Sequence, residues 1–264
     1  PPPTLLVPGS LKGKNPHEVP INYIVTWIKN RMPEFGIMPA SLINRIMVIR
    51  AETGSGKSTI IPVALFRILR SEYAPSSQGY NGRDIICTQP RVLTAITLAN
   101  DISSRSWNPD MILSKTVGFQ TKELSNKPIA GVIYATIGVL TAQLKSQSDE
   151  YIMARYQFII IDEAHERTLD SDLTLVLLKN FYLRNAGNTR LPFLILTSAT
   201  FDVHRLIAYF DLTSDNIFEV TGRTYTINTH WLAEPTSDYP KCAANTAIEI
   251  HTSNLKDKPA EADL

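Results

Sequence analysis

Short apolar runs alternate with helical patterns along this chain, and the alternation limits its possible folds more than any other feature. The runs span residues 45–50, 84–88, 131–135, 158–161 and 193–196. Stretches with apolar residues at helical spacing follow them, at residues 57–70, 92–103, 137–145, 171–183 and 203–209. Because the runs are apolar throughout, they predict strands that are covered on both faces. We therefore expect an α/β fold with a mostly parallel sheet flanked by helices on both faces.

The segments on either side of this region have a different texture. Residues 1–40 form a leader rich in Pro, Gly and Lys, with a helical pattern at residues 21–31. Beyond Val220, residues 224–232 alternate like a separate strand, and residues 243–251 have helical spacing. The expected organisation is a leader and helix over 1–40, one large α/β domain over 41–222 and a connecting segment over 223–264.

Composition excludes several classes of protein. The chain has 264 residues, of which 44% are hydrophobic and 19% charged, so it should fold around a sizeable core. Its two cysteines, Cys87 and Cys242, and its five scattered histidines favour neither a disulfide framework nor a zinc site. No run approaches the roughly 18 apolar residues of a membrane span. A formal charge of +1 means that any attraction to phosphate must come from local Lys and Arg. We expect an intracellular protein that does not contact a membrane.

A glycine-rich segment at residues 51–58, with the sequence AETGSGKS, lies between a predicted strand and a predicted helix. Glycines there let backbone N–H groups turn toward phosphates, and the following helix presents its N-terminus to the same charge. Lys57 would bind the β- and γ-phosphates, and the Ser58 hydroxyl would bind Mg²⁺. The expected nucleotide-binding residues are Glu52, Thr53, Gly54, Ser55, Gly56, Lys57, Ser58 and Thr59. The alternative is an ordinary loop beside a solvated lysine.

Two adjacent carboxylates, Asp162 and Glu163, follow the apolar run 158–161. In an open parallel sheet, ligands bind at the carboxyl ends of the strands. Asp162 would hold Mg²⁺, through water, and Glu163 would orient and deprotonate the water that attacks the γ-phosphate. The alternative is an acidic turn that caps the next helix. With the upstream glycine-rich segment, the pair predicts hydrolysis of ATP or another nucleoside triphosphate, with Mg²⁺ as cofactor.

Six ordered motifs give the chain a family resemblance from about residue 45 onward. They are TGSGKST (53–59), TQPR (88–91), YATIGVL (134–140), DEAHERTLDSDL (162–173), SAT (198–200) and GRTY (222–225). The chain resembles the DEAH (RNA helicase A-like) group of superfamily-two helicases, and its leader is similar to the NPH-II-like helicases of large cytoplasmic DNA viruses. The resemblance implies the N-terminal RecA-like lobe of an ATP-dependent helicase that moves 3′ to 5′ on RNA, in the host cytoplasm or the virion.

The resemblance also implies roles for further residues. His165, grouped with Lys57 and Glu163 as catalytic, would join the hydroxyls of Ser198 and Thr200 in coupling the nucleotide to the grip on nucleic acid. The alternatives are a structural histidine and hydroxyls that cap the following helix.

Contacts with the backbone of single-stranded nucleic acid, RNA in preference to DNA, would come from Arg91, Lys122 and Thr136. Such contacts grip phosphates without reading sequence. The alternative for each of these residues is a solvated surface position.

Two departures from the family pattern qualify these expectations. Where relatives carry an Arg that stacks on the nucleotide base, this sequence has Asp101, so we expect weak selectivity among nucleotides. No QRxGRxGR-like sequence follows, so the arginine fingers of a second RecA-like lobe are missing, and hydrolysis by this chain, expected to be a monomer, should be slow. Two other functions stay open: a nucleic-acid-stimulated NTPase that remodels protein–nucleic acid complexes, and a nucleotide-gated binding module.

Overall fold

The computed structural model describes residues 24, 26–28, 30–31, 42–51, 56–73, 83–105, 108–128, 130–199, 203–220, 231–232 and 234–257. The chain divides into two compact units, Pro1–Arg223 and Thr224–Leu264. Among the described residues of both units, no helix is long and apolar enough to cross a membrane.

An eight-stranded sheet forms the centre of the first unit, in the order β4-β3-β5-β2-β6-β7-β1-β8. β3 and β4 pair antiparallel, and the other neighbours pair parallel. The strands are β1 (Ile46–Ala51), β2 (Asp84–Gln89), β3 (Val117–Gln120), β4 (Ser125–Asn126), β5 (Val132–Thr136), β6 (Tyr156–Ile161), β7 (Phe193–Ser198) and β8 (Ile217–Val220). All five predicted runs are strands, whereas β3, β4 and β8 were not predicted.

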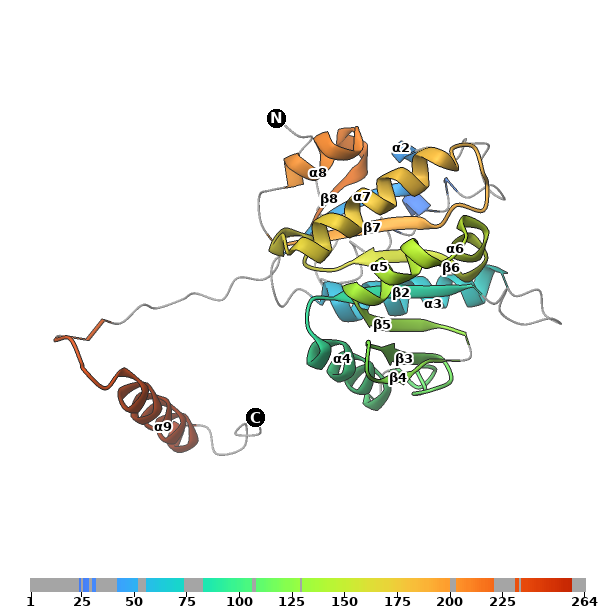
Figure 1. Ribbon diagram of the computed structural model, residues 1–264. Coiled ribbons are helices and arrows are strands. Elements are labelled where there is room, and N and C mark those ends of the chain that lie inside the picture. Colours follow the sequence, from blue (N-terminus) through green and yellow to red (C-terminus); the bar gives the residue numbers. More distant parts are fainter. Residues whose placement is uncertain are drawn as a thin grey trace, which may run out of the picture. The chain divides into compact units, whose positions relative to one another are not determined.

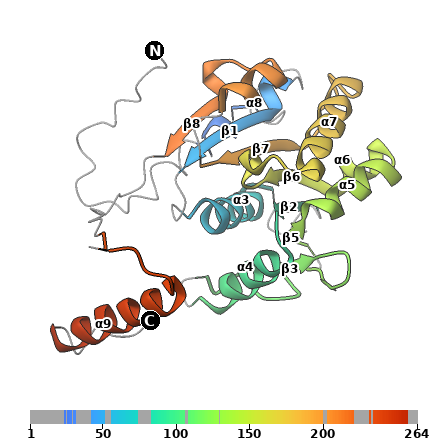
Figure 2. The same ribbon diagram turned by 60° about the vertical axis from the view of Figure 1, so that its left-hand side comes forward.

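Helices cover both faces of the sheet, which confirms the predicted fold class (Figures 1 and 2). α3 (Lys57–Tyr73) and α4 (Val92–Ser104) lie on one face. The other face carries α5 (Ile137–Ser146), α6 (Asp149–Arg155), α7 (Leu169–Arg184) and α8 (Val203–Phe210). Three shorter elements are α2 (Leu42–Arg45) and the 3₁₀ helices η1 (Ala164–Glu166) and η2 (Ser214–Asn216).

Alternate residues of each central strand enter two different cores. In β1, Met47 and Ile49 pack with the α3 and α4 side chains, whereas Ile46 and Val48 pack on the opposite face. All four are fully buried. Burial on both faces explains why these strands have no polar alternation in the sequence.

The helices differ from the predicted ranges mainly at their ends. α7 begins two residues earlier than expected because Thr168 caps it, accepting a hydrogen bond from Ser171 N at 3.1 Å. α6 was not predicted, and Ser148 caps it in the same way. The predicted strand at 45–50 is shifted by one residue, because Arg45 ends α2. Of the helix predicted at 21–31, residues 24 and 26–28 are helical, and most of its other residues lie outside the described residues.

The second unit contains α9 (Tyr239–Asp257), which extends the predicted helix at both ends. Of the strand predicted at 224–232, residues 224–230 lie outside the described residues. So do most residues of the leader and helix predicted over 1–40 and the GRTY motif at 222–225.

Candidate functional site

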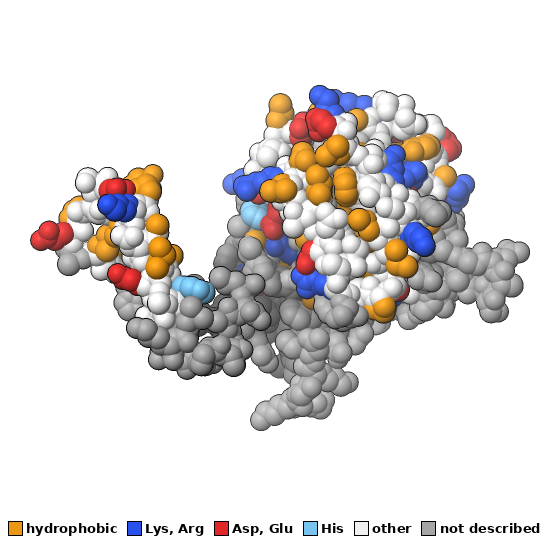
Figure 3. Space-filling view, turned by 90° about the horizontal axis from the view of Figure 1, so that it is seen from below, with side chains coloured by type: hydrophobic (Ala, Val, Ile, Leu, Met, Phe, Trp, Pro, Cys, Tyr) orange, Lys and Arg blue, Asp and Glu red, His pale blue; other side chains and the backbone are white. Residues whose placement is uncertain are grey.

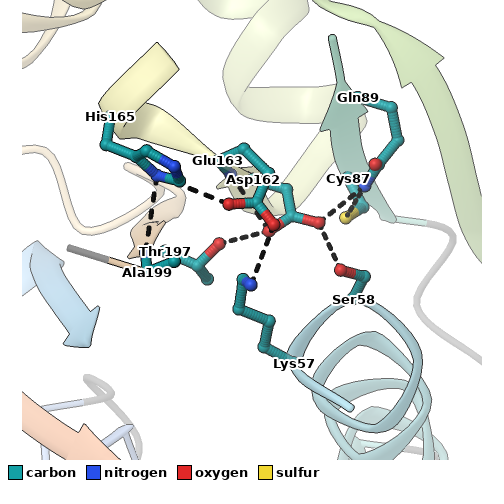
Figure 4. Close-up of polar contacts among 9 residues, drawn as sticks. All are labelled: Lys57, Ser58, Cys87, Gln89, Asp162, Glu163, His165, Thr197 and Ala199. Atoms are coloured by element: carbon teal, nitrogen blue, oxygen red, sulfur yellow. Dashed lines mark hydrogen bonds and ion pairs between the residues drawn. The ribbon is translucent and has the colours of Figure 1, made fainter. Parts of the chain in front are cut away.

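The carboxyl ends of β2, β6 and β7 lie beside the first turn of α3 and bring together polar residues from four parts of the chain (Figure 4). β6 lies between the other two strands, with Ile161 paired to Thr88 on one side and to Leu196 on the other. Asp162 follows β6 directly and therefore lies between the residues that end its two neighbours. Lys57 and Ser58 come from the first turn of α3. The two segments predicted to bind a nucleotide thus meet at one edge of the sheet.

The Asp162 carboxylate is buried and accepts four hydrogen bonds. Oδ2 accepts from Ser58 Oγ at 2.5 Å and from Gln89 Nε2 at 2.9 Å. Oδ1 accepts from Thr197 Oγ1 at 2.5 Å and from the Glu163 backbone N–H at 3.0 Å. A carboxylate has roughly four lone-pair sites, so the acceptor capacity of Asp162 is filled and its orientation is fixed.

Glu163 forms an ion pair with Lys57, whose Nζ lies 2.8 Å from Glu163 Oε1. The lysine side chain is only 4% exposed, so its charge lies where solvent screens it weakly. The other oxygen, Glu163 Oε2, is buried and has no hydrogen-bond partner among the described residues. This oxygen accepts no hydrogen bond from the described residues and lies 3.4 Å from His165 Nδ1.

Glu163 also has an unusual backbone conformation. Its φ of 52° and ψ of 42° lie in the left-handed region, as do those of Arg167 on the other side of η1. For a residue with a side chain, such a conformation costs on the order of 1–3 kcal/mol. The turn ends the extended chain of β6 and leads directly into η1.

His165 connects this segment to the end of β7. Its Nδ1 accepts a hydrogen bond from Ala199 N at 3.4 Å and lies 3.4 Å from Glu163 Oε2. The two contacts are alternatives, because Nδ1 accepts only when it carries no proton and pairs with Glu163 only when it carries one. Ser198 ends β7 and is 1% exposed, whereas Thr200 lies outside the described residues.

Only part of the predicted phosphate loop falls within the described residues. Glu52, Thr53, Gly54 and Ser55 lie outside them. Gly56 has a φ of +80°, and a Cβ at this position would lie 2.6 Å from Ile60 Cδ1. Its carbonyl accepts from Thr59 Oγ1 at 3.1 Å, so the Thr59 hydroxyl bonds within the first turn of α3. Glycine is therefore favoured at position 56 by its backbone conformation, and a larger residue would also displace the end of the Ile60 side chain.

The three predicted nucleic-acid contacts lie at the ends of neighbouring strands. Thr136 ends β5 and pairs with Gln89, Arg91 lies two residues beyond Gln89, and Lys122 follows β3. Arg91 and Lys122 are exposed, and Thr136 is partly buried. In the view of Figure 3, Lys and Arg side chains are scattered among other types over the larger unit.

Asp101, the residue at the departure from the family pattern, lies on α4 and pairs with Arg105 one turn later, at 2.5 Å. The Asp101 carboxylate is therefore ion-paired with the residue that caps the C-terminus of α4.

Sequence reasoning assigned no role to two of the residues that hold Asp162. Gln89 lies within the TQPR motif, and Thr197 directly precedes SAT. Both are polar residues at or near the end of an otherwise apolar strand, and this pattern could have indicated a role at the site. Which residue each of them contacts depends on the register between strands. Cys87 lies 3.6 Å from Gln89 Nε2, and burial raises the pKa of its thiol well above the usual range, so it stays protonated.

A cavity of about 320 Å³ opens beside the candidate site. Residues of η1 and α7 line one part of it, and residues of α8 line another. His165 and Ser198 line it together with Leu175, Val176 and Tyr209. It is therefore adjacent to the two predicted coupling residues, while Lys57 and Ser58 do not line it. Among the described residues, no group of three or more His, Cys, Asp or Glu side chains could hold a metal ion.

Comparison with known proteins gives a consistent result. The sequence model of the DEAD/DEAH box helicase family matches residues 36–207. Proteins named "Putative RNA Helicase B962L" from a South African tick isolate and a Namibian warthog isolate of African swine fever virus are each 52% identical over 271 residues. One from a Kenyan pig isolate is 51% identical. Each alignment covers 99% of this chain and 28% of the relative. The chain thus spans less than a third of the length of these relatives.

Proposed function

The chain belongs to the DEAD/DEAH box helicase family, as expected from its motifs and with relatives in a virus, and we propose that it is the ATP-binding and hydrolysing lobe of a DEAH-type RNA helicase. The observation that carries the proposal is the meeting of Lys57, Ser58, Asp162 and Glu163 at one sheet edge (Figure 4). The DEAH subtype rests on the letters at residues 162–165. In this proposal, residues 41–222 form the first RecA-like domain, and residues 223–264 begin the connection to a second.

Hydrolysis requires a water molecule in line with the γ-phosphate and positive charge on the phosphate oxygens. Lys57 would supply the charge, together with the N-terminus of α3 and backbone N–H groups of residues 52–56. Because Lys57 pairs with Glu163 at 2.8 Å, a γ-phosphate oxygen would compete for the ammonium group and release Glu163 Oε1. Glu163 would then accept a proton from the attacking water through the released Oε1, while Oε2 lies 3.4 Å from His165 Nδ1.

The donor set at this edge fits a magnesium ion. Mg²⁺ prefers hard oxygen ligands and usually keeps several waters, being bound through one or two carboxylates and the substrate phosphates. Ser58 Oγ would be a direct ligand. Asp162 would act through water, because its four lone-pair sites already accept hydrogen bonds. When bound, the ion would neutralise charge that develops on the phosphates.

His165 would link hydrolysis to the grip on nucleic acid. Its position supports the coupling role, because the same imidazole nitrogen lies 3.4 Å from both Glu163 Oε2 in the DEAH segment and Ala199 N in the SAT segment and can bond to either one. Ser198 and Thr200 would complete that link.

Arg91, Lys122 and Thr136 would contact the backbone of single-stranded RNA, with movement 3′ to 5′. The position of all three beyond the ends of neighbouring strands supports one shared contact surface. In this proposal the protein acts inside the host cell, in the cytoplasm or the virion, and hydrolysis is slow until a second lobe contributes arginine fingers.

The test is an NTPase assay on the full-length protein, with and without single-stranded RNA or DNA, for the wild type and two variants. Lys57→Ala should abolish hydrolysis, and Glu163→Gln should lower kcat by about 10²- to 10⁴-fold, as expected when a general base is lost. Lys145→Ala and Glu150→Gln change exposed residues away from these contacts and should have no effect. Hydrolysis that survives in both site variants would refute the assignment.

Two further measurements separate the alternatives. Unwinding of a 3′-tailed RNA duplex distinguishes a helicase from an NTPase that remodels complexes, and a nucleotide-gated binding module would keep its function in Glu163→Gln. Rates with ATP, GTP, CTP and UTP test the weak selectivity expected from Asp101, and a strict preference for ATP would contradict it.

A further inference from the structure

Two hydrogen bonds, one buried and one partly buried, connect the nucleotide site to the strands that end at the proposed RNA contacts. Gln89 Nε2 donates to Asp162 Oδ2 at 2.9 Å, and Tyr134 OH donates to the Ser58 carbonyl at 2.8 Å. The acceptors are the two residues proposed to hold Mg²⁺. The donors come from β2 and β5, which are adjacent in the sheet.

Gln89 is the last residue of β2 and is 2% exposed. Arg91 follows it by two residues, and Thr136 pairs with it across the sheet. A displacement of the chain at Arg91 therefore reaches β2 through Gln89, and a displacement at Thr136 acts on Gln89 through their pairing across the sheet. Because the Gln89 amide donates a hydrogen bond to the charged Asp162 carboxylate, even a small displacement of Gln89 changes the environment of Asp162.

Tyr134 reaches the site because of a proline in α3. Within an α-helix the Ser58 carbonyl would accept from the N–H of residue 62, but that residue is Pro62, which has none. The Tyr134 hydroxyl makes the bond instead, and burial raises the pKa of this phenol well above its usual range, so it remains a donor. The first turn of α3 is therefore tied to β5, two residues before Thr136.

We propose that Gln89 and Tyr134 are positioning residues through which RNA held at the carboxyl ends of β2 and β5 sets the positions of Asp162 and Ser58. The inference rests on the proposed function and adds the route by which binding of RNA and binding of nucleotide are coupled. Such coupling is reciprocal: if RNA favours the arrangement that binds nucleotide, then nucleotide raises the affinity for RNA by the same factor.

The experiment measures this factor in the full-length protein. The dissociation constant of a fluorescent single-stranded RNA is determined with and without a non-hydrolysable ATP analogue and Mg²⁺, for wild type, Gln89→Met and Tyr134→Phe. Met keeps the length of Gln without its amide, and Phe removes one oxygen atom. Gln89→Met removes the amide that donates to Asp162 and contacts Cys87 Sγ, and Tyr134→Phe removes the hydroxyl that donates to Ser58. Both leave the proposed RNA contacts in place.

Two matched controls report what the loss of a buried hydrogen bond does elsewhere. Tyr182→Phe removes a buried hydroxyl that donates to the Pro192 carbonyl at 2.8 Å, the same bond as in Tyr134 but distant from the site. Gln157→Met removes a buried amide that accepts from Arg83, at the opposite end of β6. Both should lower stability and leave the ratio of the two dissociation constants at its wild-type value.

Typical coupling factors are about 5 to 150. We expect each site variant to bring the wild-type factor to within about twofold of one, and to reduce stimulation of kcat by RNA more than the basal kcat. A wild-type factor that both site variants retain would overturn the relay and leave the proposed function intact. An equal loss in the two controls would overturn it as well. Failure of the wild type to bind RNA or hydrolyse nucleotide would instead refute the proposed function. If Gln89→Met does not fold, Tyr134→Phe decides the question.

Discussion

Replacement of Thr197 by valine tests how strongly the buried Asp162 carboxylate depends on its donors. The change keeps the side-chain shape and removes the hydroxyl that donates to Asp162 Oδ1 at 2.5 Å. Thr197 is 1% exposed and Asp162 5%, so water cannot readily replace the lost donor. A hydrogen bond to a charged group contributes about 1.5–3 kcal/mol. Three donors remain on Asp162, and we therefore expect the lower end, about 1.5–2 kcal/mol of unfolding free energy.

Thr88→Val is the matched control. Thr88 is equally buried on the neighbouring part of the sheet, but its hydroxyl donates to an uncharged acceptor, the Ile160 carbonyl, at 3.3 Å. The expected cost is about 0.5–1.5 kcal/mol, as for a neutral hydrogen bond. Urea unfolding measures both free energies. In thermal unfolding, the Tm of Thr197→Val should be about 3–8 °C below that of the wild type. Equal costs, or a larger cost for Thr88→Val, would refute the argument that the charge of Asp162 sets the difference.

Three other predictions concern stability. Glu163→Gly should give a more stable protein than Glu163→Ala by about 1 kcal/mol in urea unfolding, because only glycine adopts a φ of 52° without strain; equal stability would contradict this. Asn216→Ala should cost about 1–3 kcal/mol by the same measurement, since it leaves the buried Ile46 carbonyl without its 2.7 Å donor; a neutral effect would count against it. The hydrogen bond from Arg184 lowers the pKa of Asp149 below its usual value, so this pair stabilises the fold at neutral pH and the contribution is lost as pH falls through the folded-state pKa. Asp149→Asn should therefore reduce the acid dependence of stability, and an unchanged pH profile would exclude the effect.

The central strands could be predicted because their burial leaves a mark in the sequence. Strands β1, β2, β5, β6 and β7 are covered on both faces, and each is an apolar run. The edge strands leave no such mark, since β4 has two residues and β3 and β8 have four each. At β3 the deciding feature is a close approach: a Cβ on Gly118 would lie 2.0 Å from the Asn126 carbonyl oxygen, which only the pairing with β4 explains.

The part of the candidate site whose residues are neighbours in the sequence could be predicted. Lys57 and Ser58 are neighbours in one motif, and Asp162 and Glu163 in another, so two short segments and one rule about parallel sheets suffice. Gln89 and Tyr134 could not be found in this way. Their contacts depend on the register between β2, β5 and β6 and on a missing N–H in a helix, which are properties of the assembled sheet. The chemical roles of all these residues stay predictions until the variants are measured.

The short β4 strand has a consequence for how this molecule behaves at high concentration. Exposed strand edges carry unpaired backbone groups that another chain can extend, and natural proteins limit this by keeping such edges short. With only Ser125 and Asn126 in ladder geometry, and both polar, this side of the sheet offers a second copy too little backbone for strand exchange. Self-association of concentrated protein through strand pairing at the β4 edge is therefore not expected, and contacts on that side should leave the amount of β structure unchanged.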